Sequence, residues 1–135
     1  MYSKNSKNKG LSIDECVRRA EKLIAQQGIC VLAMDVKGSY IRLQRNANLF
    51  SERLYHLVSD LNSRFREYLP ANKIITCDEE QGFKRIRGDQ VIGGINSAKA
   101  VKLIYDYLTE NYADLPMYWS IAKDGWDDEG FSHVD

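Results

Sequence analysis

The feature that most constrains the fold of this chain is a short apolar run, residues 29–34, which stands between Gly28 and Asp35. The run contains no charged residue and does not alternate with polar residues, which is the pattern of a strand buried on both faces. A strand of this kind lies inside a sheet rather than at its edge. The sequence therefore predicts a central strand, with the carboxylate of Asp35 at its end.

A first helix is predicted before this strand. Ser12 and Glu15 have the spacing of a capping box, and Gly28 is a typical residue for the end of a helix. Between them, apolar residues recur at helical intervals, at Ile13, Val17, Ala20 and Ile24.

Two more helices are predicted further along the chain. The second follows a loop rich in Arg and Asn and ends before Pro70. Its buried face comprises Leu54, Leu57, Val58, Leu61, Phe65 and Tyr68. The third begins with Asn96 or Ser97 as its capping residue. Its buried stripe comprises Ala100, Val101, Ile104, Tyr105, Leu108 and Tyr112.

Short runs with the composition of strands occupy residues 73–77, 83–87, 91–95 and 117–122. The run at 83–87 alternates between apolar and charged residues, as a half-solvated strand does. Gly88, Asp89 and Gln90 supply the tight turn of a hairpin to the run that follows. Asp89 is therefore expected at the tip of this hairpin.

Without the first helix, the elements follow the order strand, helix, strand, strand, helix, strand. This is the order of the ferredoxin-like fold, an α+β arrangement in which an antiparallel sheet carries its helices on one face. The chain has 135 residues, 44% of them hydrophobic, which suffices for one core. We predict a single α+β domain over residues 11–135, after a polar, disordered leader at residues 1–10.

The composition narrows the set of partners. Nineteen basic residues balance nineteen acidic ones, so nucleic acid is not an expected partner. No apolar stretch approaches the roughly 20 residues of a membrane span, and the N-terminus lacks a hydrophobic signal core, so we expect a cytoplasmic protein without a membrane contact. Three widely spaced cysteines, Cys16, Cys30 and Cys77, are expected as reduced thiols rather than as a disulfide or a zinc site.

Asp35 and Asp89 are the candidates for a metal site. An ionised carboxylate at the end of a buried strand is costly to desolvate unless it meets a cation or several hydrogen-bond donors. In the predicted fold the first strand lies next to the hairpin, so Asp35 approaches the tip that carries Asp89. Two carboxylates, completed by phosphate oxygens and water, suit Mg²⁺ or Mn²⁺. The alternative for each residue is a purely conformational role in a turn.

The segment after Asp35 is a candidate phosphate site. The backbone amides of Val36, Lys37, Gly38 and Ser39 can turn toward a phosphate at the start of the next element. Basic residues that could approach the same phosphate are Lys84, Arg85 and Arg87, together with Arg42 and Arg45. The alternative for each basic residue is a solvated surface position.

These segments resemble the core of class III nucleotidyl cyclases and of GGDEF-type palm domains, and they also resemble the SatD family. The resemblance rests on VLAMDVKGS at residues 31–39, LNSRF at 61–65 and KRIRGDQVI at 84–92. It implies that Asp35 and Asp89 bind the metal. It also implies that the backbone of residues 36–39 holds a triphosphate.

The sequence also departs from these families. Ser39 and Tyr40 stand where cyclases have a Phe-Thr pair, and Gln90 stands where GGDEF and SatD proteins have Glu. Residues 120–125 lack the Gly-x-x-x-Gly element of cyclases. Because the chain ends at Asp135, we also expect it to lack the Asn and Arg residues with which cyclases recognise the base and stabilise the transition state. The resemblance therefore implies nucleotide binding without complete cyclase activity.

Two functions are consistent with these features. The first is a metal-dependent domain that binds a nucleoside triphosphate or another phosphate compound. The second is a non-catalytic regulatory or protein-interaction module of SatD type, which binds a partner or forms a homodimer. An RNA-binding module of the same topology would need paired aromatic residues and a basic sheet face, which the sequence does not supply. Whether the protein is an enzyme stays open at this point.

Overall fold

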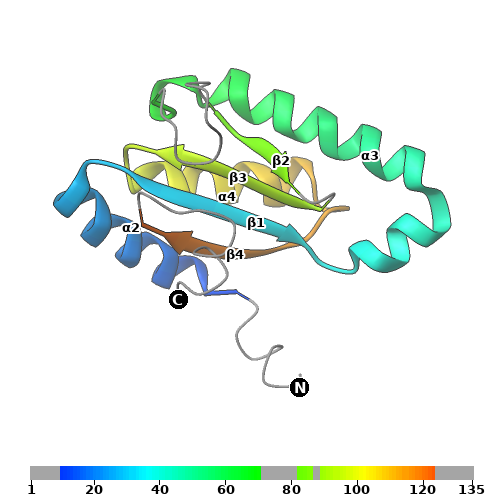
Figure 1. The fold of residues 1–135 in the computed structure, drawn as a ribbon, viewed down its shortest axis with the longest axis horizontal. Coiled ribbons are helices and arrows are strands. Elements are labelled where there is room, and N and C mark those ends of the chain that lie inside the picture. The colour runs from blue at the N-terminus through cyan, green and yellow to red at the C-terminus, as the bar shows by residue number, and fades with distance from the viewer. Residues whose placement is uncertain (1–9, 71–81, 87–88, 124–135) are drawn as a thin grey trace.

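The computed structural model describes residues 10–70, 82–86 and 89–123, with the side chains of all but residues 39–44. These ranges form a four-stranded sheet with helices packed against it (Figure 1). The elements in chain order are α2 (Ile13–Gln27), β1 (Cys30–Val36), α3 (Ser39–Arg64), the 3₁₀ helix η1 (Arg66–Tyr68), β2 (Lys84–Ile86), β3 (Gln90–Ile95), α4 (Lys99–Asn111) and β4 (Met117–Ala122).

The strands lie in the order β2-β3-β1-β4, and each runs antiparallel to its neighbours. In β1, Leu32 is paired with Gly93 of β3 on one side and with Ile121 of β4 on the other. The predicted α+β class and the central position of the first strand are therefore confirmed. β1 extends to Val36, two residues beyond the predicted run, so Asp35 lies within the strand rather than after it.

The described helices pack on one face of the sheet. The main core cluster joins Leu32 and Met34 of β1 to Leu57 of α3, Ile104 of α4 and Ala20 of α2. Figure 1 shows α4 behind the sheet, α2 near β4 and α3 along the β2 side. This packing buries the apolar stripes that the sequence analysis identified.

A second, smaller cluster lies on the opposite face of the sheet and comprises Val31, Ala33, Ile92 and Ala122. These four side chains are at most 2% exposed. Residues that are directly opposite in register share a face of the sheet, so Asp35, Gln90 and Tyr118 belong to this second face. The carboxylate position in β1 therefore lies on the side away from the described helices.

The ends of α2 agree with the sequence prediction. Ser12 and Glu15 form the capping box, in which each residue's side chain accepts a hydrogen bond from the backbone N–H of the other. At the other end Gly28 adopts a left-handed conformation with φ 84°, and its N–H donates to the carbonyl oxygen of Ile24 at 2.7 Å. The change from helix to strand is thus determined by local sequence.

The predicted loop rich in Arg and Asn is wrong, because α3 already begins at Ser39. Asn46 interrupts the helix with an extended backbone (φ −162°, ψ 91°), and its Oδ1 accepts a hydrogen bond from the N–H of Leu49 at 2.9 Å. Asn46 therefore caps a second helical segment that continues to Arg64. The sequence did not reveal the segment before Asn46, because the segment is too short for a recurring helical stripe.

Other sequence predictions have mixed outcomes. The last strand, Met117–Ala122, and the antiparallel β2–β3 hairpin are confirmed. The predicted cap of α4 at Asn96 or Ser97 is replaced by Ala98, which makes no side-chain cap, although Ser97 Oγ accepts a hydrogen bond from the N–H of Lys99 at 3.2 Å. The leader before Gly10, the strand at 73–77 and the side chain of Arg87 lie outside the described residues. Within the described part of the chain, no helix is long and apolar enough to cross a membrane.

Phe83 attaches the start of β2 to both α3 and β3. Its backbone N–H donates to Oδ1 of Asn62 at 2.6 Å, and its carbonyl oxygen accepts from Nδ2 of the same residue at 3.1 Å. Its ring lies over Gly93, where an added Cβ would be 2.5 Å from Cδ1 of Phe83. Gly93 is therefore required by the close approach of this ring.

We predict that Gly93→Ala lowers the free energy of unfolding by about 1–3 kcal/mol, because the new methyl group overlaps the Phe83 ring. Urea unfolding followed by circular dichroism measures the change. In a Phe83→Leu background the cost of the same substitution should fall, because the obstructing ring is absent. An equal cost in both backgrounds would show that the overlap is not its cause.

Candidate functional site

The end of β1 brings the two predicted metal ligands to neighbouring positions. Asp35 is paired with Gln90, the first residue of β3, and Asp89 directly precedes that residue. The N–H of Val36 donates to the carbonyl oxygen of Asp89 at 3.2 Å. Both aspartates are half-buried. The proximity that the sequence predicted therefore holds for the backbone of these residues.

The direction of the two carboxylates is determined differently. Asp35 belongs to a regular ladder and faces the side of the sheet away from the helices. Asp89 belongs to a turn, so the alternation of side chains along a strand does not determine the direction of its carboxylate. Among the described residues, no group of three or more His, Cys, Asp and Glu side chains is arranged to hold a metal. A cation bound by these two aspartates would need oxygen ligands from a bound molecule or water.

The predicted phosphate segment turns at Gly38, which has a left-handed conformation (φ 70°) and directly precedes α3. Two of its amides donate hydrogen bonds within the chain. Val36 donates to Asp89, and Lys37 donates to the carbonyl oxygen of Pro116 at 2.8 Å. The amides that follow, at the start of α3, belong to the helical turn whose N–H groups have no acceptor within a helix.

A pocket of about 640 Å³ lies beside this turn. Two predicted phosphate-binding residues, Lys37 and Gly38, contribute to its wall, whereas Asp35 and Asp89 do not. The other residues that line it are Arg45, Asn46, Leu49, Phe50, Arg53, Asp114 and Leu115. Three cationic side chains and one carboxylate give this lining a net charge of +2. The pocket therefore has the electrostatic character of an anion site.

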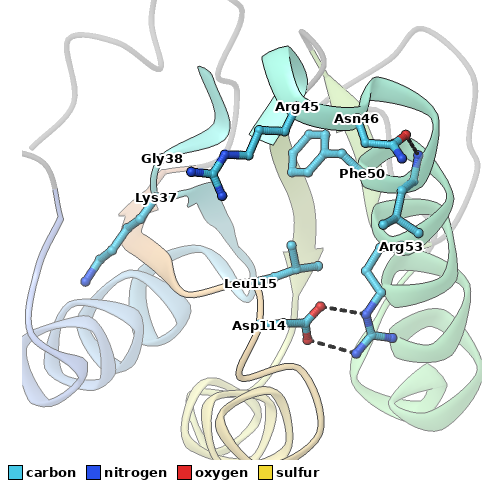
Figure 2. A pocket seen from close by; sticks show the side chains of 9 residues that line it. Lys37, Gly38, Arg45, Asn46, Phe50, Arg53, Asp114 and Leu115 are labelled. Carbon is cyan, nitrogen blue, oxygen red and sulfur yellow. Dashed lines mark hydrogen bonds and ion pairs between the residues drawn. The ribbon is translucent and has the colours of Figure 1, made fainter. Parts of the chain in front are cut away.

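Figure 2 shows how the cationic side chains are placed. Arg45 reaches across the pocket toward Gly38, and Leu115 lies below it. Among the described residues, Arg45 has no ion-pair partner. Lys37 points away from Arg45, and its ammonium group lies 5.0 Å from the centre of the Tyr118 ring. Arg45 is thus the cation best placed to meet a ligand.

Arg53 is held in place from two sides. Its Nε and one terminal nitrogen donate to the two carboxylate oxygens of Asp114 at 2.8 and 2.9 Å, as Figure 2 shows. The guanidinium carbon also lies 4.4 Å from the centre of the Tyr112 ring. The hydrogen bond to Asp114 raises the pKa of Arg53, so the guanidinium stays charged. This pairing fixes a planar cation in the pocket wall.

Behind Arg53, an acidic residue connects α3 to α4. Asp60 Oδ2 accepts hydrogen bonds from the hydroxyls of Tyr107 at 2.5 Å and Tyr112 at 2.8 Å, and Arg64 lies 3.7 Å from Oδ1. Partial burial alone would raise the pKa of Asp60, but these hydrogen bonds and the charge of Arg64 lower it. Burial and the bond to Asp60 raise the pKa of Tyr112 to about 12. The network positions Tyr112, and through it Arg53.

No known protein family matches the chain, and no curated protein or solved structure is significantly similar to it. The resemblance to cyclases, GGDEF domains and SatD proteins therefore stays a prediction.

Two further basic candidates, Lys84 and Arg85, lie apart from the pocket, whereas the side chains of Arg42 and Arg87 lie outside the described part of the chain. Lys84 and Arg85 belong to β2, which β3 separates from β1, and neither lines the pocket. Arg85 donates a hydrogen bond to the hydroxyl of Ser51 on α3 at 3.1 Å. Arg85 is therefore placed to support the β2–α3 contact.

Sequence reasoning missed Asn46, Arg53 and Asp114. Arg53 and Asp114 are 61 residues apart, and no local pattern connects them. A helix predicted from Ser39 onward would have placed Leu49 and Arg53 one turn apart on one face, as the structure does.

The two described cysteines are not candidates for nucleophilic chemistry. Cys16 and Cys30 are both buried and free, as predicted. Burial raises the pKa of each thiol to about 12, so both stay protonated at neutral pH. Cys77 lies outside the described residues.

We predict that Asp60→Ala lowers the free energy of unfolding by about 2 kcal/mol at pH 7, because it leaves the Tyr107 and Tyr112 hydroxyls without their acceptor. The matched control is Asp106→Ala. Within the described part of the chain Asp106 pairs with Lys102 alone, on the exposed side of α4, so its loss should change the free energy of unfolding by less than about 0.5 kcal/mol.

The same pair of variants gives a pH dependence. The pKa of Asp60 is lower in the folded than in the unfolded chain, so protonation favours unfolding. The stabilisation is present above the unfolded pKa of about 4 and is lost as pH falls below it. Urea unfolding between about pH 6 and 3 should therefore show a steeper loss of stability in the wild type than in Asp60→Ala. Parallel curves would contradict this role of Asp60.

Proposed function

We propose that this protein is a divalent-metal-dependent domain that binds a nucleotide or another phosphate compound, without complete cyclase activity. The observation that carries the proposal is the pocket at the start of α3, where Arg45 reaches toward the turn at Gly38 and Lys37 and Arg53 contribute to the same lining. Arginine side chains and the amides that begin a helix are the groups that proteins use most often to hold phosphate.

The strand order supports the finer part of the fold prediction, a ferredoxin-like palm. The order β2-β3-β1-β4, with antiparallel neighbours, places the hairpin β2–β3 beside β1 and β4 on its other side. This is the arrangement that the order strand, helix, strand, strand, helix, strand has in that fold. Fold alone does not determine function, so the proposal depends on the pocket.

The metal part of the proposal depends on Asp35 and Asp89. Their backbones meet at the end of β1, which is also where the chain turns into the pocket at Lys37 and Gly38. Mg²⁺ and Mn²⁺ commonly take one or two carboxylates together with phosphate oxygens and water. A ligand whose phosphates extend from Arg45 past Gly38 and around the end of β1, toward the face of the sheet that carries Asp35, would supply the oxygens that the two carboxylates lack.

One observation favours a second candidate, a regulatory or protein-interaction module that is not catalytic. Tyr55 and Leu49 are large apolar side chains on α3, and they are 74% and 60% exposed. Exposed apolar side chains on one helix can contribute to a partner surface or to a homodimer. Leu49 also lines the pocket, so only Tyr55 favours this candidate independently.

Calorimetric titration with ATP, with and without Mn²⁺, tests whether Asp35 and Asp89 bind a metal. We expect Mn²⁺ to tighten the binding of ATP to the wild type, and we expect Asp35→Asn and Asp89→Asn each to remove this effect, a loss of at least about tenfold in affinity. Asp106→Asn serves as the control, because Asp106 lies on α4 away from the site. Equal enhancement by Mn²⁺ in all variants would exclude the aspartates as metal ligands.

Titration with inorganic triphosphate tests the pocket. Arg45→Ala should weaken binding about tenfold, because a charge-assisted hydrogen bond contributes roughly 1.5–3 kcal/mol. Asp114→Asn should strengthen it several-fold, because it removes the one carboxylate of the lining. If the wild type binds neither triphosphate nor ATP, the interaction module becomes the better explanation.

A further inference from the structure

We propose that the pocket contains an apolar subsite, formed by Leu49, Phe50 and Leu115, which holds the base of a bound nucleotide while Arg45 holds its phosphates. This inference depends on the proposed function and adds to it the part of the ligand that is not phosphate. The base would contact α3 and the loop before β4, rather than the strands of the sheet.

The size of the pocket is the first argument. Its volume is about 640 Å³, which lies within the range of pockets that bind organic molecules of drug size. A phosphate group beside Gly38 and Arg45 would fill only the end of the pocket near the turn. The remainder, along α3, therefore has room for a second group.

The character of that remainder is the second argument. Phe50 and Leu115 are each 4% exposed and belong to the core, so they form a rigid apolar floor. Leu49 stands beside them on α3 with 60% of its surface exposed. A flat apolar group that covers this leucine would bind favourably, because the contact removes apolar surface of both groups from water.

The spacing of the cations relative to this surface is the third argument. Leu49 precedes Arg53 by one helical turn, and Asn46 begins the same helical segment. Arg53 is already bonded to both oxygens of Asp114, so its charge is partly balanced. Arg45, which has no ion-pair partner among the described residues, is left as the main contact for phosphate. Phosphate and base would therefore bind at different ends of one pocket.

The base would be held by contact more than by hydrogen bonds. The side-chain oxygen of Asn46 already accepts from the N–H of Leu49, so its amide nitrogen is the group of this residue that remains to donate to a base. Apolar contact and stacking tolerate any base, because every base has a flat face. We therefore expect ATP and GTP to bind with affinities within about threefold of each other.

Calorimetric titration of the full chain in Mg²⁺, with inorganic triphosphate, ATP and GTP as probes, tests the subsite. We expect ATP to bind the wild type about tenfold more tightly than triphosphate does, from the contact of the base. In Leu49→Ala this advantage should fall to about threefold or less, while the affinity for triphosphate stays the same. Leu49 is mostly exposed, so the variant should retain the wild-type melting temperature.

Tyr55→Ala is the matched control, because Tyr55 is also a large exposed apolar residue of α3 but does not line the pocket. It should leave the advantage of ATP unchanged. If triphosphate and ATP bind the wild type equally, or if Leu49→Ala retains the full advantage of ATP, the apolar subsite is wrong while phosphate binding stands. If no probe binds, the proposed function itself is wrong and the subsite is rejected with it.

Discussion

The structure depends on the way in which the end of β1 is attached on both sides. The N–H of Val36 bonds to Asp89 in the hairpin turn, and the N–H of Lys37 bonds to Pro116 just before β4. Since β1 is the buried strand between β3 and β4, its end cannot shift without breaking these bonds. The turn at Gly38, and the start of α3 after it, therefore have a fixed position relative to three strands. The pocket forms where these connections meet.

The far wall of the pocket depends on the contact between α3 and α4. Asp60 bonds to two tyrosine hydroxyls of the α4 region, and one of these tyrosines, Tyr112, lies beneath the guanidinium of Arg53. Asp114 then orients the same guanidinium from the loop before β4. A cation of α3 that is held by both the end of α4 and the loop before β4 has few alternative positions. The site is thus built by packing between elements that are distant in sequence.

The sequence predicts the parts of this structure that depend on local patterns. The continuous apolar run gave the central strand, the Ser12–Glu15 spacing gave the first cap, and the hairpin turn gave the approach of Asp89 to the first strand. The first segment of α3 was missed because it ends at Asn46 before a helical stripe can recur. The Arg53–Asp114 pair was missed because it forms only after α3 and the entry to β4 have packed together.

The break at Asn46 has an electrostatic consequence. It gives α3 a second helical N-terminus, and Asn46, Leu49 and Phe50 around it line the same pocket that the first N-terminus borders at Gly38. Each helix start carries a partial positive charge from its aligned peptide dipoles, on the order of half an elementary charge. These partial charges are produced by the backbone and do not titrate. The N–H groups at these helix starts therefore add a contribution to the attraction for anions that does not change with pH.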